Sequence, residues 1–123
     1  MTWLAIFIGG GLGSVFRFGI TKLLLEFKEK TLFPWATLLS NFLACVVLAI
    51  VSYSFLEGKS ISSNWKLFWT VGFCGGFSTF STFSLENWEL YKSGNYGILA
   101  ANILLSLFLG MLIFWLLEKK LSL

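Results

Sequence analysis

The chain has 123 residues, of which 57% are hydrophobic and only 12% are charged, with a net charge of +3. A soluble domain is nearer about 45–50% apolar and about a quarter charged, so a soluble fold of this size would lack the polar residues to cover its surface. The absence of His and Asp excludes metal sites built from His and Cys and any mechanism that needs a histidine base. The basic residues are dispersed and not interleaved with aromatic ones, so no nucleic-acid partner is expected.

Four apolar stretches are long enough to cross a bilayer as helices, which takes about 20 residues. They span residues of about 3–25, 34–56, 65–91 and 93–117, and the second and fourth carry no charged residue. The connections between them are short and leave no room for a second domain. We therefore predict an all-α membrane protein in which residues 1–123 form a single four-helix transmembrane domain, embedded in the lipid bilayer.

The lysine residues near the ends of these stretches do not favour one orientation. With four spans, both termini and the middle loop share one side of the membrane. The lysines that flank this side are Lys59, Lys66, Lys119 and Lys120, and those that flank the other are Lys22, Lys28, Lys30 and Lys92. Because the Lys/Arg bias of short loops sets the orientation of a membrane protein, a chain without such a bias is able to insert both ways. Insertion in both orientations would allow an antiparallel homodimer of dual topology, which is our hypothesis.

The first stretch combines closely spaced glycines with a cation. Gly9 and Gly13 are four residues apart and share one helix face, where they allow another backbone to approach closely. The glycine run lacks the third glycine and the preceding strand of a dinucleotide fingerprint. Arg17 lies within the stretch, where a cation is costly and normally faces protein or water. It either attracts anions in a vestibule or extends to the lipid headgroups near Lys22.

The second stretch begins at Pro34, which suits the first turn of a helix. Thr37 and Asn41 follow and are four residues apart, so they share a helix face. The amide donors of Asn41 lie some two turns into an uncharged span and need partners. Either they form a hydrogen bond to another helix or they line an ion path, and the residue alone does not decide between the two.

The third stretch has residues at its centre that weaken a helix. Residues 72–84 contain three glycines, followed by Ser and Thr residues interleaved with Phe. Irregular backbone at membrane depth is tolerated where it is buried in protein or lines a cavity, and broken helices often mark ion sites in transporters. We predict a break here, with free carbonyls for a cation, hydroxyls for an anion, and positive ring edges from Phe80 and Phe83. The alternative is a packing seam of small residues.

The last stretch carries one polar or small face. Asn102, Ser106 and Gly110 follow one another at intervals of four residues. This face either pairs with the third stretch or completes a polar track. Glu86, one helical turn past Phe83, is the only acidic residue near membrane depth, and we expect it in an interfacial vestibule.

Three motifs along the whole chain carry a resemblance to a known family. They are Gly9-Gly10-x-x-Gly13-x-x-x-Arg17, then Thr37-Leu38-x-x-Asn41, then Gly75-Gly76-Phe77-Ser78-Thr79-Phe80-Ser81-Thr82-Phe83-Ser84. In these motifs the chain resembles the Fluc/CrcB family of bacterial fluoride channels, and the last motif is the most specific. Four spans in a chain of this length and the balanced lysines agree with the resemblance.

The resemblance implies a fluoride-selective channel for passive export, which protects the cell from fluoride toxicity. It implies a multi-pass protein of the bacterial inner membrane, with the third helix broken in mid-membrane and two pores in an antiparallel homodimer. The expected fluoride path comprises Asn41, Phe80, Phe83, Ser81, Thr82, Thr37, Ser106 and Asn102, with Arg17 and Glu86 at its vestibules. A structural sodium ion at the dimer interface is expected on the backbone carbonyls of Gly75 and Ser78.

Two other functions share some of these features. A small multidrug exporter also uses four helices and dual topology, but its chemistry needs a membrane-embedded carboxylate in an early span, and the first two spans have none. A structural subunit of a membrane complex would not need a glycine run beside a polar phenylalanine run. An enzyme is not expected, because the sequence offers no set of nucleophile and base.

Overall fold

The computed structural model describes residues 1–58 and 60–121, apart from the side chain of Phe27, and every regular element in these ranges is a helix. The elements are, in chain order, α1 (Thr2–Leu23), α2 (Leu25–Lys30), α3 (Trp35–Leu56), α4 (Ser63–Leu67), the π-helix η1 (Phe68–Phe73), α5 (Cys74–Phe77), α6 (Phe80–Lys92) and α7 (Tyr96–Leu121). Lys59, one of the balanced lysines, lies outside the described residues. The prediction of an all-helical protein is confirmed for the described part of the chain.

Three of these helices, α1, α3 and α7, are long and apolar enough to cross a membrane. They contain 22, 22 and 26 residues. At a rise of about 1.5 Å per residue, each is at least as long as the roughly 30 Å hydrocarbon core of a bilayer. Many of their large apolar side chains are exposed on the surface of the chain, as expected of side chains that face lipid.

The predicted third span is not one continuous helix. Residues 63–77 are helical through α4, η1 and α5, and α6 begins only at Phe80. The first of these helices starts at an N-cap, because the Ser62 hydroxyl accepts a hydrogen bond from the backbone N–H of Trp65. None of these four elements is by itself long enough to cross a membrane, unlike α1, α3 and α7.

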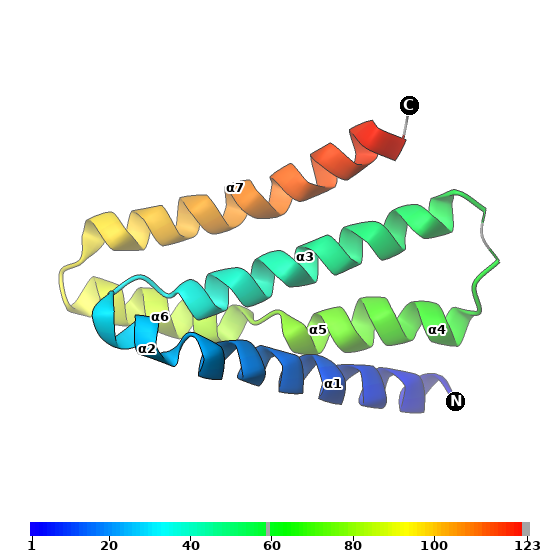
Figure 1. Cartoon of the computed structure of the whole chain (residues 1–123), viewed down its shortest axis with the longest axis horizontal. Coiled ribbons are helices and arrows are strands. Elements are labelled where there is room, and N and C mark those ends of the chain that lie inside the picture. The colour runs from blue at the N-terminus through cyan, green and yellow to red at the C-terminus, as the bar shows by residue number, and fades with distance from the viewer. Residues whose placement is uncertain (59, 122–123) are drawn as a thin grey trace.

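The elements run back and forth along one direction, as Figure 1 shows. The start of α1, the end of α3, the start of α4 and the end of α7 lie at one end of the molecule, and α2 and the turn from α6 to α7 lie at the other (Figure 1). The turn from α6 to α7 is closed by Gly94, whose φ of +79° is the left-handed conformation that favours glycine. The Asn95 N–H donates to the Leu90 carbonyl across this turn, and α7 starts at Tyr96, close to the expected start of the last span at about residue 93.

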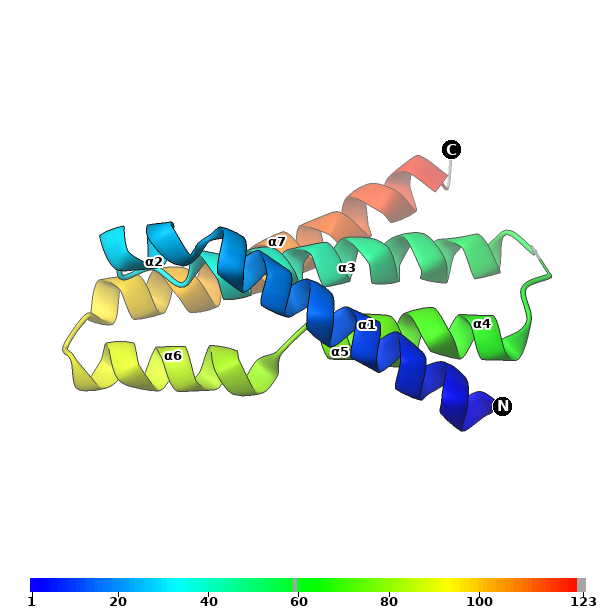
Figure 2. The same ribbon diagram turned by 60° about the horizontal axis from the view of Figure 1, so that its bottom comes forward.

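Helix α1 crosses η1 and α5 with backbone directly against backbone (Figure 2). A Cβ atom at Gly9 or Gly13 would overlap a carbonyl oxygen of the opposite helix, that of Phe68 or of Phe73. On the other side, a Cβ at Gly76 would overlap the Gly10 carbonyl oxygen. The predicted close approach at the first glycine pair is therefore present, and its partner is the glycine run of the third stretch. We call this contact the glycine crossing; it comprises Gly9, Gly10, Gly13, Gly72 and Gly76.

Candidate functional site

The helix that begins at α4 is interrupted at Ser78 and Thr79, which we call the irregular segment. Both residues have extended backbone, with φ −80° and ψ 157° at Ser78 and φ −149° and ψ 115° at Thr79. The Thr79 N–H would bond to the Gly75 carbonyl if the helix continued, but it donates instead to a side chain on α3. The hydroxyl residues thus form the interruption, whereas Gly75 and Gly76 remain within α5.

The side chain that holds the irregular segment is the amide of Asn41. Its Oδ1 accepts from the Thr79 N–H at 2.7 Å, and its Nδ2 donates to the Thr79 carbonyl at 3.3 Å. Both backbone groups of Thr79 therefore have a partner although neither belongs to a helical ladder. An amide nitrogen carries two hydrogens, so Asn41 retains a second N–H for another acceptor. The two predictions for Asn41, a bond between helices and a donor to an ion, are compatible.

Thr79 also starts α6 and so positions the phenylalanine run. Its Oγ1 accepts from the Thr82 N–H at 3.2 Å and lies 3.3 Å from the Ser81 hydroxyl. Phe80, the first residue of α6, is 80% exposed, and its ring centroid is 6.4 Å from that of the half-buried Phe83. The two rings therefore lie together at the start of α6, with Phe80 uncovered by its own chain.

The interruption changes the hydrogen bonding of the carbonyl groups that precede it. The Ser78 N–H and its hydroxyl both donate to the Cys74 carbonyl, at 2.9 and 2.8 Å. The next carbonyl, that of Gly75, loses its helical partner because the Thr79 N–H is bound to Asn41. Gly75 is exposed, and a Cβ there would meet no atom within 4 Å. A free carbonyl on an open face suits a sodium ion, which unwound backbone and helix C-terminal ends commonly bind.

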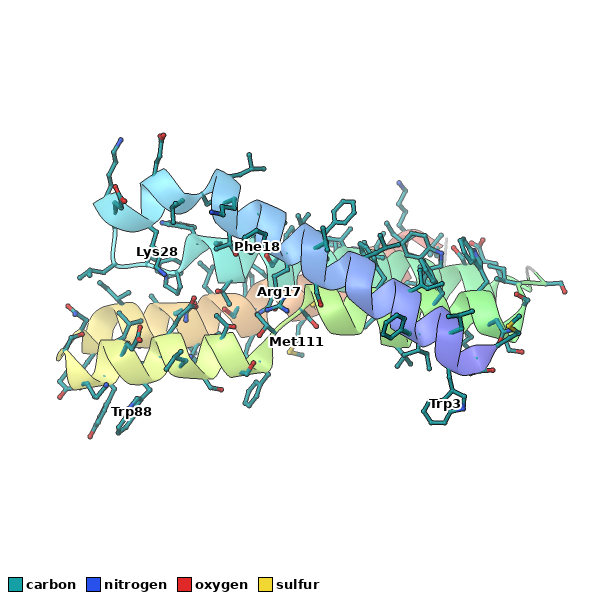
Figure 3. The ribbon with its side chains drawn as sticks, turned by 90° about the horizontal axis from the view of Figure 1, so that it is seen from below. Trp3, Arg17, Phe18, Lys28, Trp88 and Met111 are labelled. Atoms are coloured by element: carbon teal, nitrogen blue, oxygen red, sulfur yellow. The ribbon has the colours of Figure 1, made fainter. Side chains whose placement is uncertain are left out.

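Arg17 lies at the level where α5 ends and α6 begins (Figure 3). Its Nε donates to the Gly76 carbonyl at 3.1 Å, and the side chain is half-buried. The guanidinium thus binds one of the last carbonyls of α5, where the helix dipole favours a cation. This contact is an alternative to extension toward the headgroups, and it leaves the remaining guanidinium N–H groups for other acceptors.

A second group of predicted residues lines a cavity of about 430 Å³ between α6 and the segment from α2 to the start of α3. The buried Thr37 donates from its hydroxyl to Glu86 Oε1 at 2.7 Å. Thr82 also lines this cavity, together with the charged side chains of Lys28 and Glu89. The structure therefore brings Thr37, Thr82 and Glu86 to one cavity at one end of the molecule.

Comparison with known proteins places this geometry in a family. A family model described as "CrcB-like protein, Camphor Resistance (CrcB)" matches residues 4–117. The chain belongs to the CrcB family. The matched range contains every predicted site residue and both sides of the irregular segment. As a CrcB-family chain with three candidate spans among its described residues, the protein is a multi-pass membrane protein.

Curated members of the CrcB family resemble the chain over most of its length. A "Fluoride-specific ion channel FluC" of Azobacteroides pseudotrichonymphae genomovar. CFP2 is 44% identical over 108 residues, which cover 84% of this chain and 82% of the relative. A relative of the same name from Pyrococcus abyssi (strain GE5 / Orsay) is 40% identical, and the aligned region covers 91% of this chain and 94% of the relative. A third relative of this name, from Proteus mirabilis (strain HI4320), is 37% identical, and the aligned region covers 94% of this chain and 95% of the relative.

Asn87 is a polar residue of this CrcB-family chain that was not among the predicted site residues, and it contacts the predicted residue Asn102. Asn102 on α7 is 1% exposed, and its Nδ2 donates to Asn87 Oδ1 on α6 at 2.7 Å. The Ser106 hydroxyl donates to Asn102 Oδ1 at 3.5 Å. The polar face of the last stretch therefore pairs with α6, which is one of the two alternatives that the sequence left open. Asn87 follows Phe83 by four residues, and this spacing was the only sequence signal for it.

Proposed function

We infer that the chain is a fluoride-selective ion channel that exports fluoride passively and thereby protects the cell from fluoride toxicity. The curated relatives are named as fluoride-specific ion channels, and these names describe a channel, not an enzyme. The observation that carries the inference is the Asn41 amide. It holds the irregular segment with one N–H and keeps a second donor beside the start of α6. A multidrug exporter is not favoured, because α1 and α3 contain no carboxylate.

The irregular segment joins two helix ends of opposite polarity. The helical run of residues 63–77 ends in carbonyl groups, whereas α6 begins with N–H groups that have no helical partner. The C-terminal end of a helix favours positive charge and the N-terminal end favours negative charge. Arg17 occupies the carbonyl side through Gly76, so the start of α6 is the favourable place for an anion.

Fluoride is strongly hydrated, and its water has to be replaced by donors of the protein. An isolated ion in a medium of dielectric about 4 would cost on the order of tens of kcal/mol. In our proposal Asn41 donates its free N–H, Ser81 and Thr82 donate hydroxyls, and the edges of the Phe80 and Phe83 rings fill the remaining directions. Ring edges are weak partners, which suits a path from which the ion must leave.

The carbonyls of Gly75 and Ser78 are the groups that we propose to hold a structural sodium ion. When bound, the ion supplies a fixed positive charge that lowers the electrostatic cost of a nearby anion. One chain offers only a few carbonyls at this place, and Gly75 lies on an uncovered face. A second copy of the chain would complete the oxygen set and would cover this face.

We propose that α4, η1, α5 and α6 together form a fourth crossing, broken at the irregular segment in mid-membrane. Residues 1–123 would then form one four-helix transmembrane domain of the bacterial inner membrane. Two such chains would pair as an antiparallel homodimer, which the balanced lysines permit and which would cover the exposed Phe80. A C-terminal tag found on only one side of the membrane would contradict this arrangement.

Efflux from liposomes that hold the purified protein tests the proposed function. We expect the wild-type protein to release fluoride much faster than chloride, and Phe80→Ile to abolish the fluoride efflux, because Ile offers no positive ring edge. Phe7→Ile is the matched control, since Phe7 is 78% exposed on α1, far from the irregular segment in sequence. Efflux of neither anion from wild-type liposomes would favour a structural subunit instead.

Substitution of Arg17 separates its charge from its hydrogen bond. The glutamine side chain of Arg17→Gln is able to donate to the Gly76 carbonyl but carries no charge. We expect the variant to fold and to release fluoride several-fold more slowly at low ionic strength, because the positive charge of Arg17 lowers the electrostatic cost of an anion near the irregular segment. The difference from wild type should shrink as salt is added.

The control for this substitution is Lys22→Gln, which removes a cation from the same helix. Lys22 is exposed, and its Nζ lies 5.5 Å from the centre of the ring of Phe18, a residue of the same helix. Equal slowing in both variants would assign the effect to the overall charge of the chain and not to Arg17.

A further inference from the structure

The hydrogen bond between Asn87 and Asn102 is the buried polar contact between α6 and α7. Asn102 is one of the two largest fully buried side chains of the described residues, and the 2.7 Å bond to Asn87 gives its amide nitrogen a partner. A buried amide without a partner costs a substantial part of its hydration free energy. The bond is therefore directional: α6 has to present Asn87 toward α7 for both amides to be satisfied. We call these two residues the amide pair.

The amide pair and the phenylalanine rings lie on the same face of α6. A helix turns by about 100° per residue, so Asn87 lies within about 40° of Phe83 and about 20° of Phe80 around the helix axis. A rotation of α6 that breaks the amide pair would therefore turn both rings away from their present direction. Among the described residues, no other side chain of α6 forms a hydrogen bond to α7 as short as that of Asn87.

The irregular segment leaves α6 free of the helix that precedes it. The Thr79 N–H bonds to Asn41 and not to Gly75, so the helical ladder does not transmit the rotation of α5 to α6. Beyond Thr79, two consecutive residues bind α6 to different helices. Glu86 accepts from Thr37 on α3, and Asn87 accepts from Asn102 on α7, about 100° further round the axis. Two bonds in different directions oppose a rotation that one bond alone would permit.

We propose that the amide pair sets the rotation of α6 and thereby aims Phe80 and Phe83 at the fluoride path. This inference rests on the proposed function. It makes Asn87 a positioning residue, and it gives Asn102 a role that acts through α6 and does not require contact with fluoride. Ser106 supports the pair by donating to Asn102.

The test compares Asn87→Leu, Asn102→Leu and the double variant in planar bilayers, where single-channel fluoride currents are recorded. Leu has the branched shape of Asn but cannot form the bond. We expect each single variant to lower the unitary fluoride current on the order of tenfold, and the double variant to be no worse than either, because the same interaction is lost only once. The fraction of liposomes that release fluoride, which counts assembled channels, should remain at the wild-type value.

The controls separate positioning from folding and from the proposed function. Asn64→Leu makes the same change at an exposed amide of α4, bonded to Thr2, and should leave the current unchanged. If Asn87→Leu does not assemble, Asn87→Ser carries the same expectation, because its side chain is too short to reach Asn102. A normal unitary current with fewer active channels would overturn the proposal in favour of a structural role, as would unchanged currents in both single variants. A wild-type protein without fluoride current would instead contradict the proposed function.

Discussion

A Gly13→Ala chain is expected to fail to form the glycine crossing, and little folded protein should be recovered from the membrane. A Cβ at this position would overlap the Phe73 carbonyl oxygen and lie 2.7 Å from the Phe77 nitrogen. Overpacking of a core usually costs about 1–3 kcal/mol, because side chains move aside. Here the obstructing atoms belong to backbone, so α1 itself has to move, and we expect a larger loss. Size-exclusion chromatography after detergent extraction measures the yield.

Gly11→Ala is the matched control on the same helix. A Cβ at Gly11 would meet no atom within 4 Å, and Ala favours a helix over Gly. This variant should therefore be recovered at or above the wild-type yield. Recovery of Gly13→Ala at the wild-type yield, with fluoride efflux retained, would show that α1 does not need the close approach seen in the structure.

An Asn41→Asp channel is expected to assemble but to lose fluoride conduction by at least about a hundredfold. The carboxylate still accepts from the Thr79 N–H, so the irregular segment keeps its shorter bond to α3. Asp has no N–H, so the donor to the Thr79 carbonyl and the free donor are both lost. Its charge would also repel fluoride: two like charges 4 Å apart interact by about 4 kcal/mol at an effective dielectric of 20. A fluoride electrode that follows liposome efflux gives the result.

Asn64→Asp provides the comparison, because it places the same new charge on α4 without touching the irregular segment. The fluoride efflux of Asn64→Asp should match that of the wild-type chain. Efflux at the wild-type rate in Asn41→Asp would remove Asn41 from the fluoride path. Loss of assembly in Asn41→Asp alone would instead assign to Asn41 the single role of holding Thr79.

The long apolar helices were predictable because length and hydropathy suffice to define a membrane helix. The ends of these helices were less predictable. The predicted first connection contains the short helix α2, which a count of apolar residues does not distinguish from a loop. The last span was predicted to begin at about residue 93, and α7 begins at Tyr96, directly after the turn that contains the left-handed Gly94.

The place of the interruption depends on tertiary contacts that a linear pattern does not contain. The sequence pattern predicts one weak region that contains the three glycines and the hydroxyl residues, but in the structure the two groups have different roles. Gly72 and Gly76 remain helical and pack against α1, whereas Thr79 leaves the helix because Asn41 of α3 binds its backbone. The π-helix η1 has no local signal that separates it from α-helix in the same sequence.

The sequence indicates which residues are candidates for the site, but it does not indicate their hydrogen-bond partners. Periodicity placed Thr37 and Asn41 on one face, and in the structure they bind different parts of the third stretch, Glu86 and Thr79. The bond from Asn102 to Asn87 depends on the register between α6 and α7, which the turn at residues 93–95 determines. Such register is a property of the folded chain and is absent from either helix alone.

The glycine crossing also restricts how the protein is able to evolve. In an ordinary core, a larger side chain becomes acceptable when a neighbouring side chain becomes smaller. At Gly13 and Gly76 the neighbours are carbonyl oxygens, amide nitrogens and other backbone atoms, which every amino acid retains. A genetic screen for second-site suppressors of a substitution at either glycine should therefore yield only revertants, whereas a screen that starts from the lipid-exposed Phe7 has many compensating changes open to it.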